Sequence, residues 1–116
     1  YITQSGMSVH LFREPGGTEF GEKLRSAILT STVDLDPVAE AMLFASSRAQ
    51  LLSERVLPLL QSPKNIVIVD RYIDSSLAYQ GYTQMLGFEN ILKIHQFPPL
   101  TTMPKLTFYI KISVRT

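Results

Sequence analysis

The sequence predicts an α/β fold in which helices cover a mainly parallel sheet. Residues 65–70 (NIVIVD) include an apolar run without alternation, which is typical of a strand buried on both faces of a parallel sheet. Segments of strand and helix character follow one another in the order β-α-α-β-α-α-β. That order is typical of folds in which helices are layered on a sheet.

The first quarter of the chain contains one strand and one helix in this interpretation. Residues 1–6 resemble the end of a helix that closes on Gly6, and residues 8–13 form a short strand. A loop over residues 14–18 follows, because its proline and two glycines cannot continue a strand. We expect the next helix over residues 21–29.

A long helix is predicted to begin at Asp36 and Pro37. An aspartate can accept hydrogen bonds from the first amides of a helix, and a proline there needs no partner for its missing N–H. We expect the helix to run to about Leu57, with Pro58 and Pro63 ending it. At 100° per residue its apolar stripe comprises Val38, Met42, Ala45, Ala49, Leu52 and Val56.

The second half of the chain is expected to hold two more helices and a last strand. Residues 75–80 begin a helix with Asp74 as its cap, and residues 88–95 form another. Residues 98–99 are prolines and break that helix. Residues 106–114 are interpreted as the final strand.

Composition limits the classes of function. The chain has 116 residues, 45% of them apolar, with 11 basic and 10 acidic side chains, which predicts a single domain without a large nucleic-acid surface. The absence of cysteine excludes thiol chemistry and fits a reducing compartment, so we expect a cytoplasmic protein. The longest aliphatic run, residues 66–69, is too short to span a membrane, so no membrane association is expected.

An arginine stands beside a carboxylate at the carboxyl end of two predicted strands. These pairs are Arg13-Glu14 and Asp70-Arg71. Ligands of open parallel sheets bind beyond the carboxyl ends of strands, where a carboxylate can hold Mg²⁺ and an arginine can bind phosphate. Each pair alone is equally well explained as a structural ion pair, but two at equivalent strand ends favour a phosphate site.

Phe44 and Arg48 are neighbours on the long helix, four positions apart, about 100° from its apolar stripe. A ring beside a guanidinium suits a planar polar group such as a nucleobase. The alternative is that Phe44 packs under a loop and Arg48 pairs with Glu40 or a solvent-exposed group. Periodicity alone favours this alternative.

Ser76, Tyr79 and Gln80 share one face of the next predicted helix. The Gln80 amide can pair with the imide edge of a base, and the Tyr79 ring can contact a sugar. The alternative is that Ser75 or Ser76 caps the helix and Tyr79 is half-buried.

Two other patterns are set aside. Residues 16–23 (GGTEFGEK) nearly match a phosphate-binding loop, but Glu22 stands where the lysine belongs and would repel phosphate. His10 and His95 have no partner spacing, so neither is expected to act as a metal ligand or a base.

Together these segments resemble the thymidylate kinase family. The resemblance is carried, in the family's order, by REPGGT at 13–18, GEKLR at 21–25, AEAMLFASSRAQ at 39–50, DRYIDSSLAYQG at 70–81 and LTFYI at 106–110. It implies a partial fold of the P-loop nucleoside monophosphate kinase type, a three-layer α/β structure with a parallel sheet. Residues 1–116 would form one partial domain, the acceptor half.

The resemblance also implies a reaction and roles for residues. ATP and dTMP would give ADP and dTDP in dTTP biosynthesis, with Mg²⁺ as cofactor. Phe44 would stack on thymine, Arg48 would bind its O4 edge, and Gln80 with Ser76 would read the imide edge. The other implied substrate-binding residues are Tyr79 against the deoxyribose, Arg71 at the acceptor phosphate, and Arg13, Arg25 and Ser75. Arg71, Asp70 and Glu14 would be catalytic, with Asp70 and Glu14 organising Mg²⁺, in part through water.

Several departures from the family matter. No segment corresponds to the family's Gly-rich phosphate loop with its lysine, its arginine-bearing lid or its closing helices. We therefore expect an internal piece of a longer chain that starts before Tyr1, inactive alone, with a homodimer expected by resemblance. Lys105 and Lys111 stand where the family usually has acidic residues.

Two other functions stay open. One is a kinase-like module that binds a nucleotide but lacks a donor loop. The other is a deoxynucleoside kinase, whose acceptor hydroxyl would call for a general base; the arginine-rich acceptor side suits a phosphate better.

Overall fold

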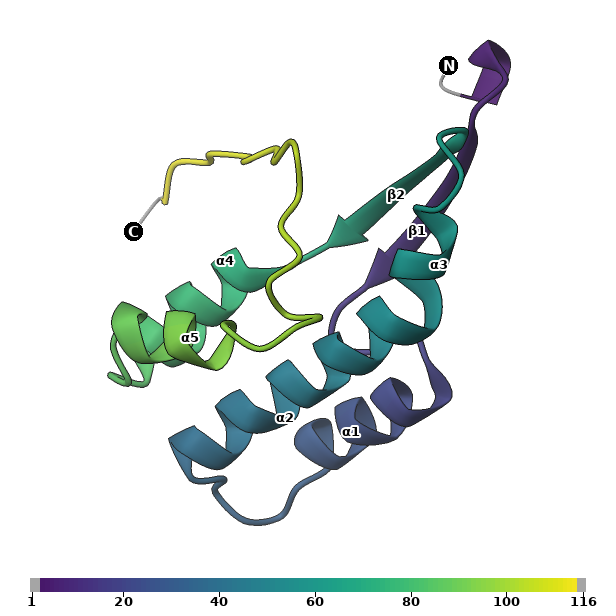
Figure 1. Cartoon of the computed structure of the whole chain (residues 1–116). Coiled ribbons are helices and arrows are strands. Elements are labelled where there is room, and N and C mark those ends of the chain that lie inside the picture. The colour runs from purple at the N-terminus through teal and green to yellow at the C-terminus, as the bar shows by residue number, and fades with distance from the viewer. Residues whose placement is uncertain (1–2, 115–116) are drawn as a thin grey trace.

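The computed structural model describes residues 3–114 and has α/β architecture. In Figure 1 a two-stranded sheet lies at one end of the molecule, and α2 runs between α1 on one side and α4 with α5 on the other. After a short 3₁₀ turn, the elements are β1 (Ser8–Arg13), α1 (Glu19–Leu29), α2 (Pro37–Leu51), a π-helical segment (Leu52–Val56), α3 (Leu57–Leu59), β2 (Asn65–Asp70), α4 (Ile73–Ser76), a second π-helical segment (Leu77–Thr83) and α5 (Phe88–Ile94).

The two strands are parallel, as the sequence predicts. Their register pairs Ser8 with Asn65 and ends with Arg13 opposite Asp70. The Glu14 N–H then donates to the Asp70 carbonyl over 3.1 Å. Both arginine–carboxylate pairs of the sequence therefore lie side by side at the same edge of the sheet.

Two expectations about strands are wrong. No ladder forms in the described residues of 106–114: the segment has no regular secondary structure, and Phe108 and Ile110 are 85% and 84% exposed. A strand needs a neighbour with free backbone groups, and in Figure 1 this segment runs away from the sheet. Nor is β2 buried on both faces, since Ile68 is 41% exposed beside a single partner strand.

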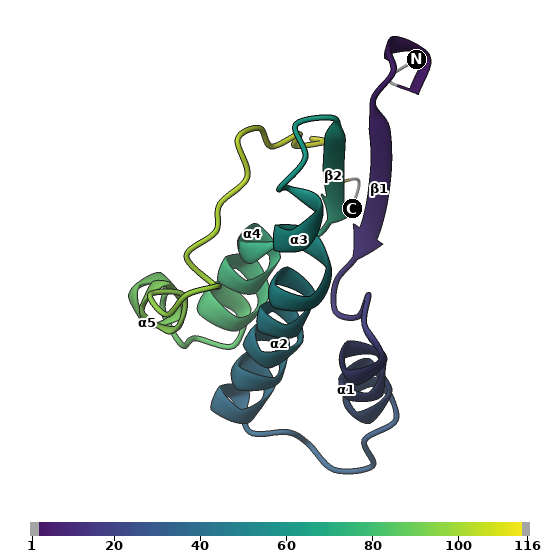
Figure 2. The same ribbon diagram turned by 45° about the vertical axis from the view of Figure 1, so that its right-hand side comes forward.

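The long helix begins as predicted, and Ala45, Leu52 and Val56 of its predicted apolar stripe are buried in the core. Asp36 Oδ1 accepts hydrogen bonds from the amides of Val38 and Ala39. Val38 and Met42, expected in the core, are each 50% exposed. Because α2 packs between α1 and the α4–α5 side, as Figure 2 also shows, its buried residues are Ala41, Ala45, Ser47, Arg48 and Leu51.

Helix ends differ from expectation in two places. The helix continues past Pro58 to Leu59. The π-helical turn just before Pro58 is wider, which relieves the clash of a proline ring with the preceding turn. Asp74 does not cap the next helix, because α4 already begins at Ile73 and has no side-chain cap. The predicted helix end at 1–6 is described only in part, because Tyr1 and Ile2 lie outside the described residues. Within it, the Gly6 N–H donates to the Thr3 carbonyl, and Gly6 has a φ of 83°.

The loop after β1 is pressed against α2. The Gly16 N–H donates to Ser47 Oγ over 3.1 Å, and Thr18 caps α1 by accepting from the Gly21 N–H. At Gly21 an added Cβ would lie 3.0 Å from Ser47 Oγ and from the Gly16 carbonyl. Glycine therefore allows the close approach that places Glu14, just ahead of this loop, against α2.

None of the helices in the described part of the chain is long and apolar enough to cross a membrane.

Candidate functional site

Two adjoining cavities lie where the strand ends meet the helices. The first has a volume of about 300 Å³ and the second about 350 Å³. Glu14, Phe44 and Arg71 line both, together with the apolar Ile28 and Leu29 of α1. Between them the cavities are lined by every site residue that the sequence singled out: Arg13, Glu14, Arg25, Phe44, Arg48, Asp70, Arg71, Ser75, Ser76, Tyr79 and Gln80.

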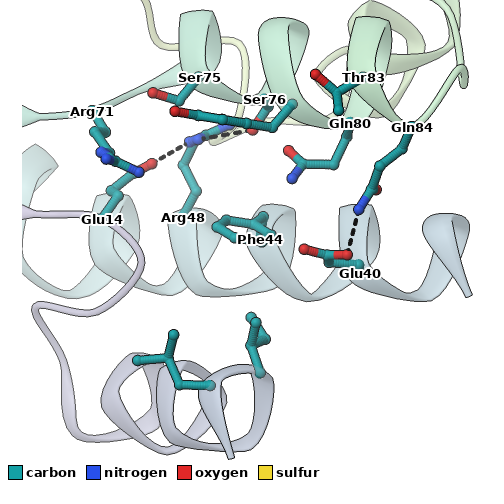
Figure 3. A pocket seen from close by; sticks show the side chains of 13 residues that line it. Glu14, Glu40, Phe44, Arg48, Arg71, Ser75, Ser76, Gln80, Thr83 and Gln84 are labelled. Atoms are coloured by element: carbon teal, nitrogen blue, oxygen red, sulfur yellow. Dashed lines mark hydrogen bonds and ion pairs between the residues drawn. The ribbon is translucent and has the colours of Figure 1, made fainter. Parts of the chain in front are cut away.

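The first cavity lies between α2 and the helical turns that follow β2. Figure 3 shows the Gln80 amide directed across the hollow toward the Phe44 ring. Gln80 is 3% exposed, yet its Oε1 has no hydrogen-bond partner among the described residues. Buried amide oxygens are nearly always paired, so this unpaired acceptor indicates a place for a polar ligand.

Arg48 is the most constrained side chain of the site and is only 1% exposed. Its Nε donates to Glu14 Oε1 over 2.7 Å, and its Nη2 donates to Ser76 Oγ over 3.2 Å. The guanidinium also lies over the Tyr72 ring, 4.9 Å from its centroid. The alternative pairing with Glu40 or a solvent-exposed group is therefore wrong.

Glu40 has a different partner at the far end of the same cavity. Its Oε2 accepts a hydrogen bond of 2.6 Å from Gln84 Nε2 (Figure 3). Gln84 Oε1 is buried without a partner in the described structure. Glu40, Thr83 and Gln84 complete the lining of this cavity and were not singled out from the sequence.

His95 is a further contact that the sequence did not reveal. It caps the carboxyl end of α5, is 5% exposed, and its Nε2 lies 2.6 Å from Arg48 Nη1. The two residues are 47 positions apart, and no local spacing connects them. Nothing in the sequence therefore indicates this contact, because the partner of His95 comes from tertiary packing.

The surroundings of Arg48 shift the acidity of two groups. Burial raises the pKa of Glu14, although the charge and hydrogen bond of Arg48 act against that rise. Burial also raises the pKa of Tyr72 to about 12, with Arg48 opposing the shift and Glu14 adding to it. Tyr72 thus keeps its proton at neutral pH and donates it to the Thr102 carbonyl over 2.7 Å.

The second cavity gathers basic side chains around the strand ends. Arg13, Arg25 and Arg71 line it with Asp70, and Arg25 Nη1 donates to the Pro15 carbonyl over 3.1 Å. Arg71 has a φ of 68° and its guanidinium lies 5.8 Å from the centroid of the Tyr79 ring. A left-handed backbone at a non-glycine residue costs free energy and is concentrated at ligand-binding positions. Arginine forks suit phosphate oxygens.

Residues 16–23 nearly match a phosphate-binding loop, but a carboxylate of the same segment already occupies one of its backbone amides. Glu22 Oε1 accepts the Gly17 N–H over 3.1 Å. An anion would need such amides free, so the geometry agrees with that exclusion.

The described residues contain no group of three or more His, Cys, Asp and Glu side chains that could hold a metal ion. Asp70 is exposed at the strand end, whereas Glu14 Oε1 is taken by Arg48 and only Oε2 is unpartnered. These two carboxylates can assist a hydrated divalent cation that also binds phosphate, but they cannot enclose it alone.

The parallel strands end at an arginine-lined cavity that adjoins a cavity lined by Phe44 and Gln80. Ligands of open α/β sheets bind beyond the carboxyl ends of strands, and this architecture is compatible with part of a P-loop kinase fold. A family model described as thymidylate kinase matches residues 1–116. The chain belongs to the thymidylate kinase family.

Individual relatives agree with this assignment. The thymidylate kinase of Thermoanaerobacter sp. strain X514 is 42% identical over 113 residues, 97% of this chain and 55% of that protein. The thymidylate kinase of Bacillus licheniformis is 46% identical over 112 residues, 96% of this chain and 52% of that protein. The crystal structure of thymidylate kinase from Ehrlichia chaffeensis superimposes with a TM-score of 0.70 at 37% identity, covering 75% of this chain and 49% of that one. The chain thus spans about half the length of the curated relatives it matches.

Proposed function

We propose that this chain supplies the dTMP-binding side of a dTMP kinase, which transfers the γ-phosphate of ATP to dTMP and forms dTDP for dTTP biosynthesis. The observation that carries the proposal is that Glu14, Phe44 and Arg71 line both cavities, so that the two lie side by side. A ligand with a planar head and an anionic tail fits this arrangement, with its head in the first cavity and its tail in the second.

The first cavity offers the groups that a thymine ring needs. Phe44 provides a stacking surface, which is worth about 1–3 kcal/mol per base in comparable sites. The Gln80 amide has both a donor and an acceptor, so it matches the N–H and carbonyl of an imide edge. Arg48 keeps one further N–H on each Nη nitrogen for the O4 carbonyl, with Ser76 beside it.

The second cavity offers positive charge to the acceptor phosphate. In this proposal Arg71 binds the phosphate, with Arg25, Arg13 and Ser75 nearby, and Tyr79 lies against the deoxyribose. An oxygen of the acceptor phosphate itself attacks the γ-phosphorus of ATP, so no protein nucleophile is required. Catalysis then rests on positioning and on neutralising charge, to which Arg71, Asp70 and Glu14 contribute.

Mg²⁺ would neutralise charge between the donor and acceptor phosphates when bound. Asp70 and the unpartnered Oε2 of Glu14 are the carboxylate atoms that fit its waters. The described residues offer no phosphate-binding loop for ATP. We therefore propose that the 116-residue chain binds dTMP without phosphorylating it. A cytoplasmic location, expected from the absence of cysteine, and a homodimer, expected from the resemblance, stay part of this proposal.

Calorimetric titration of the chain tests the acceptor site. We expect dTMP to bind more tightly than thymidine, and Phe44→Ala to weaken dTMP about tenfold or more. Phe97→Ala is the matched control, because Phe97 is 72% exposed and lines neither cavity.

Each other result has a defined meaning. No binding of dTMP by the folded chain would contradict the proposal. Tighter binding of thymidine than of dTMP would favour a deoxynucleoside kinase. Formation of dTDP by the chain alone, with ATP and Mg²⁺, would contradict the view that it holds only the acceptor half.

A further inference from the structure

The Arg48 guanidinium is held by three elements that are distant in the sequence. Glu14, in the loop after β1, accepts from Nε, and Ser76 of α4 accepts from Nη2. His95, the cap of α5, accepts from Nη1 and is the shortest of the three contacts at 2.6 Å. Each nitrogen of the planar fork therefore has its own partner, and the plane of the guanidinium is defined by all three.

The protonation of the His95 ring follows from its second contact. Its Nδ1 lies 2.8 Å from the Ile91 carbonyl, which can only accept, so Nδ1 carries the hydrogen. Nε2 of the neutral ring is then a lone-pair acceptor for Arg48, which can only donate. The two contacts are compatible with one tautomer, the Nδ1–H form.

The charges around His95 favour that neutral form. Arg48 is the charged group that faces the ring, and Glu14 on the far side of Arg48 balances its charge. The ion pair of Lys93 and Glu89, on the same helix, is exposed. A proton on Nε2 would remove the acceptor and place two cations in contact. Burial and Arg48 accordingly lower the pKa of His95, although the Ile91 carbonyl acts against this.

The other two partners cannot replace His95. Glu14 holds the Nε side, and the Ser76 hydroxyl is a neutral acceptor at 3.2 Å. Without His95, the Nη1 of Arg48 would be a buried donor that has lost its acceptor. Leaving a buried donor unpaired costs free energy, so the guanidinium would turn toward another partner. Since Arg48 lines the first cavity next to Phe44, such a turn changes the N–H groups presented to a ligand.

We propose that His95 is a positioning residue, whose unprotonated Nε2 holds Arg48 in the orientation that binds the O4 carbonyl of the pyrimidine. This inference rests on the proposed dTMP site and adds to it a residue that lines neither cavity. It also links the affinity for the base to the protonation of His95, because acid removes the acceptor.

Two variants separate the acceptor from the bulk of the ring. His95→Gln retains an oxygen four bonds from Cα, the same number as Nε2, whereas His95→Leu retains volume without an acceptor. We expect His95→Leu to raise the Kd for dTMP about tenfold or more, and His95→Gln to stay within about threefold of the wild type. His10→Gln is the matched control, since His10 bonds Asn65 and lines neither cavity.

The pH profile adds a readout that a merely structural role would not change. The Kd of the wild type should rise as the pH falls below the ordinary histidine range, more steeply than that of His95→Gln. Ionisation of the dTMP phosphate, near pH 6, affects both proteins equally. Nitrogen-15 NMR of the ligand-free protein should show Nδ1 of His95 protonated and Nε2 unprotonated at neutral pH.

The outcomes distinguish the two proposals. Unchanged dTMP affinity in a folded His95→Leu protein would overturn the role of His95 alone. Should that variant not fold, identical pH profiles for the wild type and His95→Gln would overturn it instead. A proton on Nε2 by NMR would overturn it without any ligand. Failure of the wild type to bind dTMP would overturn the proposed function, and with it the ligand named here, while the NMR result on the tautomer stands.

Discussion

The Nε of Arg48 lies 2.7 Å from a carboxylate oxygen of Glu14, and both side chains are buried. This ion pair joins the loop after β1 to the last turn of α2, across 34 positions of sequence. It sits between the two cavities, since Glu14 lines both and Arg48 lines the first. The pair therefore both stabilises the packing of the loop after β1 against α2 and forms part of the cavity walls.

Removing one partner of this pair should lower the free energy of unfolding. Glu14→Ala leaves the Arg48 charge buried and unpaired, and breaking a buried pair in this way typically costs about 3–5 kcal/mol. Urea denaturation measures the free energy of unfolding. Glu19→Ala is the control, because its pair with Lys23 is exposed and should contribute less than about 0.5 kcal/mol. An equal loss of unfolding free energy in the two variants would mean that the buried pair stabilises the fold no more than the exposed pair does.

Stability should fall on mild acidification because of His95. Its pKa is lowered from an ordinary value of 6.5 in the folded chain, so below pH 6.5 the unfolded chain binds the proton more readily. The contribution is complete above pH 6.5 and is lost as the pH falls from there toward the folded-state pKa. Urea titrations at several pH values should show this slope in the wild type and a flatter one in His95→Gln. If His95→Gln kept the full pH dependence of the unfolding free energy, that dependence would belong to other groups.

Arg71 should discriminate between a nucleotide and a nucleoside. Hydrogen bonds to charged groups contribute about 1.5–3 kcal/mol, so Arg71→Ala should raise the Kd for dTMP about tenfold or more. The Kd for thymidine, which has no phosphate, should change less than about twofold. Calorimetry of both ligands tests this, with Lys93→Ala as a control cation outside the cavities. An equal loss for both ligands would place Arg71 at the base or sugar.

Two glycines with the same backbone angle allow a packing test. Gly17 and Gly87 both have a φ of 85°, so the backbone disfavours alanine at each. At Gly17 an added Cβ would lie 2.8 Å from Leu51 Cδ1, whereas at Gly87 nothing lies within 4 Å. Gly17→Ala should therefore be less stable than Gly87→Ala by about 1–3 kcal/mol, the usual cost of overpacking. Thermal and urea unfolding measure the difference; equal stabilities would mean that the loop moves away from α2 without cost.

Much of the candidate site was accessible from the sequence. The residues at 13–14 and 70–71 follow predicted parallel strands, and parallel strands end at the same edge, which is where Arg13 and Asp70 meet in register. Phe44 and Arg48 lie four positions apart on one helix, so their proximity is local geometry. The roles of these residues toward dTMP stay predictions.

The rest of the site depended on packing. His95 has no local feature that marks it, because its partner lies on another helix 47 positions away. Of the predicted stripe, Val38 and Met42 at the start of α2 are exposed, while Arg48, outside the stripe, is buried, since a helix held between two neighbours buries whichever faces they cover. Periodicity reports which residues share a face but not which face is covered.

The sequence by itself determined the strands at 8–13 and 65–70, the Asp36 cap, the family and the residues that follow the two strand ends. The strands and the cap depend on local features of the chain: a short apolar run bounded by residues that end a strand, and the bonding of the first helical amides. Only the tertiary structure decided that Arg48 is buried against Glu14 and His95, and that residues 106–114 have no strand beside them. Burial and strand pairing require a second surface, and no local pattern shows whether that surface is within reach.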